Sequence, residues 1–304
     1  MHIRMHIRLR PLALFATLFA CAAGAQTYPS RPITLIVPFA TGGPSDAHMR
    51  QLAPVMAKHL GQPIVIENVP GGAGNIGPAR VARAAPDGYT VLQHNLGLAT
   101  APAFHLTPGF DPAADFDYIG SMSFDPSVIM ARIDFPAGPT FGELVAYLKA
   151  NQAKISFGDG GGPSLLSALL FQSFIGTRIT MIPYKGTGPA MNDLIARHID
   201  MLSNSSSVVG PHIKAGKVRP VGVTSRMRIA SIPDVPTLHE QGLTGFEMMV
   251  WTALFAPKGL PKPVQEKLVG ALQAALEDPS LQAHFQRTGG IAATREQATP
   301  AALE

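Results

Sequence analysis

The sequence predicts an α/β protein made of two lobes, and two observations support this prediction. Extended β-branched segments alternate with apolar helical segments along most of the 304 residues, which is typical of domains built on a largely parallel sheet. In addition, two segments far apart in the chain repeat one plan, in which a strand enters a glycine-rich turn that opens a helix. These are ITLIVP-FATGGPSD at residues 33–46 and ISF-GDGGGPS at residues 155–164. The repeat predicts two lobes of similar construction.

The two glycine-rich turns form the main candidate site. Its residues are Phe39, Ala40, Thr41, Gly42 and Gly43 in the first turn, and Gly160, Gly161, Gly162 and Ser164 in the second. Each turn presents backbone N–H groups at the positive end of a helix, where anions bind. Neither turn carries a cation, so amides, hydroxyls and helix ends would hold the ligand. We therefore expect a small anionic ligand between two half-sites.

The other elements follow in alternating order. Met49, Leu52 and Met56 recur at helical spacing, and Gly61 is placed to end that helix. Further helices are expected at residues 76–84, 141–150, 164–175, 189–197 and 263–276. Strands are expected at residues 33–38, 63–69, 89–93, 155–157, 179–184, 199–202 and 218–224, and extended segments at 118–122, 127–133 and 246–255.

This order predicts two lobes joined by two or more chain crossovers. The first lobe is expected to combine residues 28–125 with residues 227–304, and the second to comprise residues 126–226. The sole tryptophan, Trp251, lies in the extended segment near the second crossover, where packing in the core or hinge is favoured over contact with a ligand.

Residues 1–25 have the features of a cleaved secretory signal. Arg4, Arg8 and Arg10 form a basic start, an apolar stretch follows at residues 12–23, and Ala-Gly-Ala at 23–25 is a small-x-small cleavage site. The apolar stretch is short for a membrane span, which is the main alternative. Lipid attachment at Cys21 is the minority interpretation, because the bulky Phe19 lies near the modified position.

The composition argues against several functional classes. The formal net charge of +4 falls to about +1 once the three leader arginines are removed, and no Lys/Arg run indicates nucleic-acid binding. The only cysteine is Cys21, so disulfides and cysteine-ligated metal are excluded from the mature chain. The histidines lack zinc-site spacing, and we expect no cofactor and no metal. With 46% hydrophobic residues the chain can build two cores of ordinary size.

An ordered set of motifs covers nearly all of the mature chain. The motifs are ITLIVPFATGGPSD (33–46), ENVPGGAGNIG (67–77), APDGY (85–89), PYKGT (183–187), HIKAGKV (212–218), the segment from Ser225 with its ending PDVPT, and LFAPKGLP (254–261). In this set the chain resembles the Bug family, the periplasmic substrate-binding receptors of tripartite tricarboxylate transporters.

The resemblance implies a type II periplasmic-binding-protein fold, in which two α/β lobes with mixed sheets flanked by helices close over a ligand in the cleft. It implies a small carboxylate or related organic ligand, membrane permease subunits as partners, and a periplasmic location; a monomer is expected. It also assigns ligand contact to both glycine turns, to the wall segment Tyr184, Lys185 and Gly186, and to the loop at residues 94–98, which contains Asn95.

The chain departs from the family pattern in three places. The second turn reads Gly-Pro-Ser-Leu at residues 162–165 where Ser-Pro-Ser-His is common. Residues 202–204 read Leu-Ser-Asn where Met-Phe-Asp is common, so Asn204 replaces an acid, and Thr41 stands where a second proline is frequent. These changes leave the expected two-lobed fold intact but alter the chemistry that faces the ligand.

Several candidates have a structural interpretation beside the functional one. Asp46 caps or occupies the first helical turn, or else binds a ligand ammonium or a wall hydroxyl, and the structural role is favoured. Lys185 is a wall contact or a solvated lysine. Ser164 is an N-cap or a ligand contact, because one hydroxyl does not easily serve as both. Asn204 is a cleft contact or part of a plain loop.

The site residues favour a binding function without catalysis. Residues 72–77 match G-x-G-x-x-G, but the next strand lacks the acidic end that a dinucleotide site requires. The chain has no G-x-S-x-G nucleophile elbow. The leading hypothesis is therefore a solute-binding receptor. A ligand sensor that feeds a signalling partner is the alternative, and an enzyme housed in the cleft ranks below both.

Overall fold

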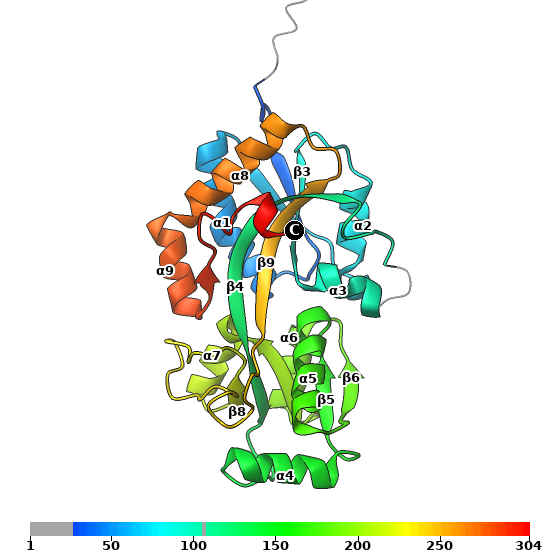
Figure 1. The fold of residues 1–304 in the computed structure, drawn as a ribbon, viewed down its shortest axis with the longest axis vertical. Helices are drawn as coiled ribbons and strands as arrows, with labels where there is room; N and C mark the ends of the chain where they lie inside the picture. Colours follow the sequence, from blue (N-terminus) through cyan, green and yellow to red (C-terminus); the bar gives the residue numbers. More distant parts are fainter. Residues whose placement is uncertain (1–26, 105–107) are drawn as a thin grey trace, which may run out of the picture.

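The computed structural model describes residues 27–104 and 108–304. The predicted signal peptide and Cys21 lie outside these residues. Within them, no helix is long and apolar enough to cross a membrane. The chain forms two lobes stacked end to end, which are linked by two long strands (Figure 1).

The first lobe is built on a mixed sheet with the strand order β2-β1-β3-β9-β4. The strands are β1 (Ile33–Val37), β2 (Ile64–Asn68), β3 (Thr90–Asn95), β4 (Phe116–Arg132), β9 (Met249–Pro257) and the short β10 (Ile291–Ala292). The first three strands are parallel, whereas β9 runs antiparallel to both β3 and β4, and β10 pairs with β4. The sheet therefore combines a parallel half with an antiparallel half.

Helices cover both faces of this sheet (Figure 1). The helices are α1 (Pro44–Leu60), α2 (Ile76–Ala82), α3 (Gly97–Phe104), α8 (Lys262–Leu276) and α9 (Pro279–Thr288), with the 3₁₀ turns η1 (Gly72–Gly74) and η2 (Pro300–Ala302). Leu52 of α1 and Leu272 of α8 share one core with Leu35 of β1, while Val81 of α2 and Leu98 of α3 belong to a core on the opposite face.

The second lobe has the same layered plan. Its strands are β5 (Ser156–Asp159), β6 (Thr180–Pro183), β7 (Met201–Ser205) and β8 (Val218–Val223), and its helices are α4 (Phe141–Asn151), α5 (Gly162–Ile175), α6 (Thr187–Ile195) and α7 (Ser206–Lys214). β5 lies parallel to β6 and β7, while β4 enters antiparallel between β7 and β8. The predicted fold class, α/β with two lobes of mixed sheets, is confirmed.

β4 passes from one lobe to the other as a single 17-residue strand. The sequence analysis expects two separate extended segments here, at residues 118–122 and 127–133. In the structure β4 pairs with β9 up to Pro126 and with β7 and β8 from Ser127 onward. A proline, which lacks a donor for the ladder, fits the point at which the partner strands change.

Thr224, which is fully buried, binds the crossing strands together. Its hydroxyl oxygen accepts a hydrogen bond from the Ser127 N–H at 2.8 Å and lies 2.8 Å from the Met248 carbonyl, to which it donates. The Thr224 backbone N–H also donates to the Ser127 carbonyl, and the Thr224 carbonyl accepts from the Met248 N–H. One side chain thus fixes both crossovers where the lobes join.

Residues 227–248 pack against the second lobe, although the sequence analysis expected them in the first. Ile229 and Ile232 belong to a core with β7 and β8, and Leu238 and Phe246 belong to a core with α4 and α5. We therefore propose that the second lobe extends to about Met248.

Candidate functional site

A cavity of about 220 Å³ lies between the lobes. The first lobe lines it with Asn75, next to η1, and with Gly97, Thr100, Ala101 and Phe104 of α3. The second lobe lines it with Asp159, Gly161, Gly162 and Leu165, where β5 ends and α5 begins. The cavity therefore extends along α3 from its first residue, Gly97, to its last, Phe104, and faces the first turn of α5. In Figure 1, α3 lies next to the second lobe at the junction of the lobes.

Gly97 of the first lobe and Gly162 of the second lobe lie close together at this cavity. A Cβ on Gly162 would lie 3.4 Å from the Gly97 Cα, and Gly162 has φ +27, which disfavours a side chain. A Cβ on Gly97 would lie 2.9 Å from the Asn95 side-chain oxygen. Glycine at both positions allows the two helix N-termini to come together.

The second glycine turn is held in place by its own side chains. The Gly161 N–H donates to Asp159 Oδ1 at 2.7 Å. The Ser164 hydroxyl accepts from the Gly160 N–H at 3.3 Å and donates to the Ser203 carbonyl at 2.8 Å. The prediction that Ser164 is the N-cap is wrong, because α5 starts at Gly162 and Gly161 occupies the cap. The serine instead fixes the turn from inside the first helical turn.

The predicted wall segment lies directly against this turn. The Tyr184 N–H donates to the Asp159 carbonyl at 2.8 Å, and Gly186, with φ +117, is the N-cap of α6. The Tyr184 hydroxyl donates to Asp193 at 2.6 Å; burial and this carboxylate raise the pKa of Tyr184 to about 12. Lys185 is exposed. The segment supports the turn, but its side chains do not line the cavity.

Asn204 is buried at the end of β7 and follows Ser203, whose carbonyl holds Ser164. Its Oδ1 accepts from the Ser205 N–H at 2.8 Å, and its Nδ2 has no partner among the residues that the structure describes. A buried amide donor next to the second turn fits a contact with ligand or water. Its role in the site remains a prediction.

Two buried residues at the end of β3, His94 and Asn95, hold the neighbouring segments in place. Asn95 Oδ1 accepts from the Gly97 N–H at 2.9 Å. The His94 ring lies 3.3 Å from the Gly74 carbonyl through Nε2 and packs edge-on against Phe39 at 5.5 Å between ring centroids. Burial lowers the pKa of His94 to about 4, so this imidazole is neutral near pH 7. Asn95 therefore positions α3 through Gly97, and His94 links the first glycine turn to η1.

The first glycine turn lies beside the cavity without lining it. Ala40, Thr41 and Gly42 are exposed, while Phe39 and Gly43 are half-buried. The Thr41 hydroxyl donates to Asn68 Oδ1 at 3.2 Å, and the Asn68 amide donates to the Phe39 carbonyl at 3.0 Å. Ligand contact by this turn remains a prediction.

Asp46 occupies the first turn of α1, as the favoured interpretation expected. Its Oδ2 accepts from the Gly42 N–H and from Arg50 Nε, both at 2.9 Å. Burial acts to raise the pKa of Asp46, but the hydrogen bonds from Arg50 and Gly42 outweigh it and hold that pKa below its usual value. One amide of the first turn is thus already bonded within its own lobe.

Of the predicted residues, only Gly161 and Gly162 line the cavity itself. Gly160, Ser164 and the Tyr184–Gly186 segment pack behind them, and Asn95 acts through Gly97. Gly97 and Asp159 fall within the expected contact loop at residues 94–98 and within the second glycine turn, but the sequence analysis did not single them out. It missed the lining residues Thr100, Ala101 and Phe104 of α3. Gly97 follows the carboxyl end of β3, where ligands bind in open α/β sheets, and this position is the signal that could have identified α3.

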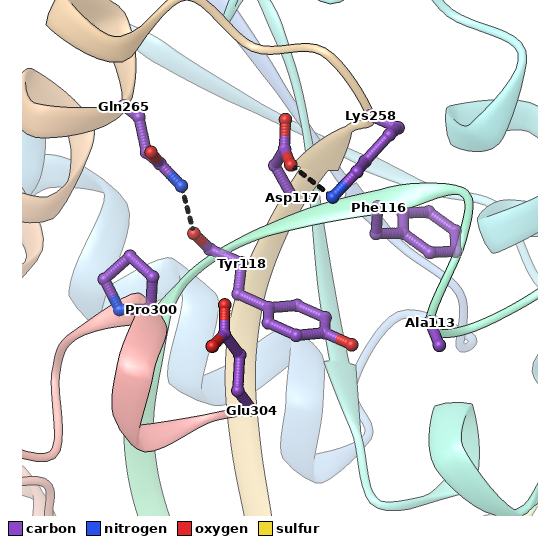
Figure 2. Close-up of a pocket in the computed structure, with 8 residues that line it drawn as sticks. All are labelled: Ala113, Phe116, Asp117, Tyr118, Lys258, Gln265, Pro300 and Glu304. Carbon is purple, nitrogen blue, oxygen red and sulfur yellow. Dashed lines mark hydrogen bonds and ion pairs between the residues drawn. The ribbon is translucent and has the colours of Figure 1, made fainter.

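A second cavity of about 290 Å³ belongs to the first lobe alone (Figure 2). There Lys258 points at Asp117, 3.0 Å away, and Gln265 donates to the Tyr118 carbonyl at 2.9 Å. The Asp117 carboxylate also accepts from the Gly259 and Leu260 N–H groups. These groups bond to one another and fix the start of α8, so we assign the site to the smaller cavity, which both lobes line.

Across residues 27–104 and 108–304, no cluster of three or more His, Cys, Asp or Glu side chains has a geometry that could hold a metal ion. The cavity between the lobes is lined mainly by backbone, amide, hydroxyl and apolar groups. Its chemistry is that of reversible binding to a small molecule.

Two lobes joined by long strands, with a cavity between helix N-termini, define the class of two-lobed periplasmic binding proteins. The solved structure of the periplasmic binding protein BugD is similar, with 42% identity and a TM-score of 0.85 over 91% of this chain and 92% of that one. MatC from Rhodopseudomonas palustris with bound malate has 34% identity and a TM-score of 0.85 over 91% and 95% of the two chains.

Residues 48–298 match the tripartite tricarboxylate transporter family receptor, and the chain belongs to this family. A UPF0065 protein from the TAR-I ttuE-ttuC' intergenic region of Agrobacterium vitis is 42% identical over 304 residues, which cover 99% of this chain and 88% of that protein. The resemblance drawn from the sequence motifs is confirmed.

Proposed function

We propose that this protein is a solute-binding receptor that captures a small carboxylate ligand between its lobes. The observation that carries the proposal is the cavity at which the N-termini of α3 and α5 meet, one from each lobe. Helix N-termini favour anions through unpaired N–H groups and the helix dipole. The relative MatC, which has malate bound, supports the same ligand class.

Hydrogen bonds alone can supply the affinity that such a receptor needs. Each hydrogen bond to a charged group contributes about 1.5–3 kcal/mol. Four or five of them offset the cost of immobilising a small molecule and leave roughly −8 kcal/mol, which corresponds to micromolar binding. A salt bridge from the protein to the ligand carboxylate is therefore unnecessary.

Ligand binding favours the closed arrangement because contacts from both lobes form only when the lobes meet. Gly97 and Gly162 form one such contact between the lobes, beside the cavity. The closed form is then the species that the membrane subunits of a tripartite transporter would recognise. The receptor carries out no chemistry on its ligand. It acts in the periplasm, as the likeness to the periplasmic binding protein BugD supports.

A thermal-shift screen of carboxylates, amino acids and aromatic acids tests this proposal. A ligand at about 100 times its dissociation constant stabilises the folded state by about 2.7 kcal/mol, which raises the melting temperature by roughly 5 °C or more. The rise should grow with ligand concentration. The absence of any shift across all three classes at millimolar concentration would contradict the proposal.

A further inference from the structure

One acidic residue, Asp159, lines the cavity between the lobes. Among the nine residues that line it, Asp159 alone carries a formal charge, and the rest are glycine, apolar, amide or hydroxyl residues. A ligand bearing only negative charge would therefore lie close to an uncompensated acid. The lining residues supply no cation to offset that repulsion.

The turn holds this carboxylate in a fixed position. Asp159 Oδ1 accepts from the Gly161 N–H at 2.7 Å, and the Asp159 carbonyl accepts from the Tyr184 N–H at 2.8 Å. Among the residues that the structure describes, Oδ2 of this half-buried side chain accepts no hydrogen bond. An acid on a fixed turn loses little conformational entropy when it accepts a hydrogen bond from a ligand.

The same small space also contains positive potential. α3 and α5 both begin at the cavity, and Gly97 and Gly162 bring their N-termini into contact. The Gly97 and Gly161 N–H groups already bond to Asn95 and Asp159, so a carboxylate would be attracted by the helix dipoles and by the remaining N–H groups of the two first turns. The cavity therefore presents an anion-binding side and an anion within one volume of about 220 Å³.

Building on the proposed receptor function, we infer that Asp159 is a specificity residue that accepts a hydrogen bond from an ammonium group of the ligand. The ligand is then a small amino carboxylate, with its carboxylate at the paired helix N-termini and its ammonium at Asp159. Opposite charges on the ligand match opposite potentials in the cavity, whereas a simple dicarboxylate matches only one of them.

Matched ligand pairs test this inference by isothermal titration calorimetry. Alanine is compared with propionate and glutamate with glutarate, so that each pair differs by the amino group. The wild-type protein should bind the amino member of a pair about tenfold or more tightly, since a hydrogen bond to a charged group has that effect on affinity. Equal or tighter binding of the member without the amino group would overturn the inference.

The Asp159→Asn variant identifies the residue responsible. Asparagine keeps the Oδ1 acceptor for Gly161 but removes the charge, so the turn should stay intact while the preference for the amino member falls to within about twofold. Glu266→Gln removes the same charge on α8, where the side chain is exposed, and should leave the preference unchanged. A preference that persists in Asp159→Asn would overturn the role of Asp159.

The outcomes separate this inference from the proposed function. Tight binding of carboxylates without discrimination by the amino group would retain the receptor and overturn only the inference. The absence of binding for every member of both pairs, in a protein that no carboxylate stabilises in the thermal-shift screen, would overturn both.

Discussion

The two glycine turns share the sequence Gly-Gly-Pro-Ser, at residues 42–45 and 161–164, yet they differ in environment. The second turn lines the cavity between the lobes, and its serine is buried and bonded to β7. The first turn is largely exposed, and its serine lies 3.4 Å from Gln93 Nε2. A shared motif thus sets the local turn, while the neighbouring elements decide whether it meets the other lobe.

The backbone also differs at matched positions. Gly42 and Gly161 have similar φ angles of +83 and +87, but Gly43 has φ −76 where Gly162 has φ +27. α1 therefore begins one residue later in its motif than α5 does. Because α5 starts earlier in its motif, Gly162 is its first residue and lies next to Gly97 of α3.

The largest difference in the free energy of unfolding between matched positions is expected at Gly160, which matches Thr41 in the first turn. A Cβ on Gly160 would lie 3.0 Å from the Thr187 Cα and 3.1 Å from the Thr187 backbone nitrogen. We expect Gly160→Ala to lower the free energy of unfolding by about 3 kcal/mol, because the backbone must move. Thr41→Ala, at an exposed position, should cost less than about 0.5 kcal/mol. Urea denaturation measures both, and equal effects would contradict the comparison.

A titratable side chain, His94, packs against Phe39 of the first turn, so the stability of this region should vary with pH. The folded pKa of His94 is about 4, below its ordinary value of 6.5, so its contribution to stability is present above about pH 6.5 and is lost as the pH falls toward 4. We expect the free energy of unfolding to fall by about 2 kcal/mol between pH 7.5 and pH 5 through this residue.

The His94→Gln variant isolates this effect from other titrating groups. The pKa of His284 is also lowered to about 4 by burial, and burial raises that of Asp125, so the total pH dependence is a sum. The variant should lose about 2 kcal/mol less than wild type over the same pH range. His198→Gln, at a side chain that is 70% exposed, is the control and should follow wild type. Identical slopes for all three proteins would refute the assignment.

A smaller change in the free energy of unfolding is expected at the matched serines, Ser164 and Ser45. Ser164→Ala removes the group that accepts from Gly160 and donates to Ser203, and we expect a loss of about 1.5 kcal/mol in the free energy of unfolding. Ser45→Ala removes only a long contact with Gln93 and should cost under about 0.5 kcal/mol. Chemical denaturation of the two variants compares them directly. An equal or larger loss for Ser45→Ala would show that burial does not distinguish the turns.

Periodic segments could be predicted from the sequence because their burial is a local property. Met49, Leu52 and Met56 are all buried on α1, and Gly61 ends that helix with φ 74, as the spacing indicated. By contrast, the sequence analysis predicts no helix at α3 and only a loop at residues 94–98. Its sequence GLATAPAF shows no apolar stripe, contains Pro102 and buries little beyond Leu98 and Ala101.

The candidate site could be predicted only in part. The glycine turns are visible in the sequence because glycine is needed where the backbone adopts positive φ or another chain approaches closely. The role of Asp159 depends on α3 lying across from it in the other lobe, and no local pattern encodes that contact. For the same reason, the sequence could not show that the first turn lies beside the cavity while the second turn lines it.

The most direct test of the account fills the cavity from the second turn. Leu165 lines the cavity, whereas Leu169, one helical turn further along α5, is exposed and does not. We predict that Leu165→Trp weakens binding of the carboxylate with the largest thermal shift by at least about tenfold, measured by calorimetry, while Leu169→Trp leaves it unchanged. Unchanged affinity in a folded Leu165→Trp protein would contradict the claim that the ligand binds where α3 and α5 meet.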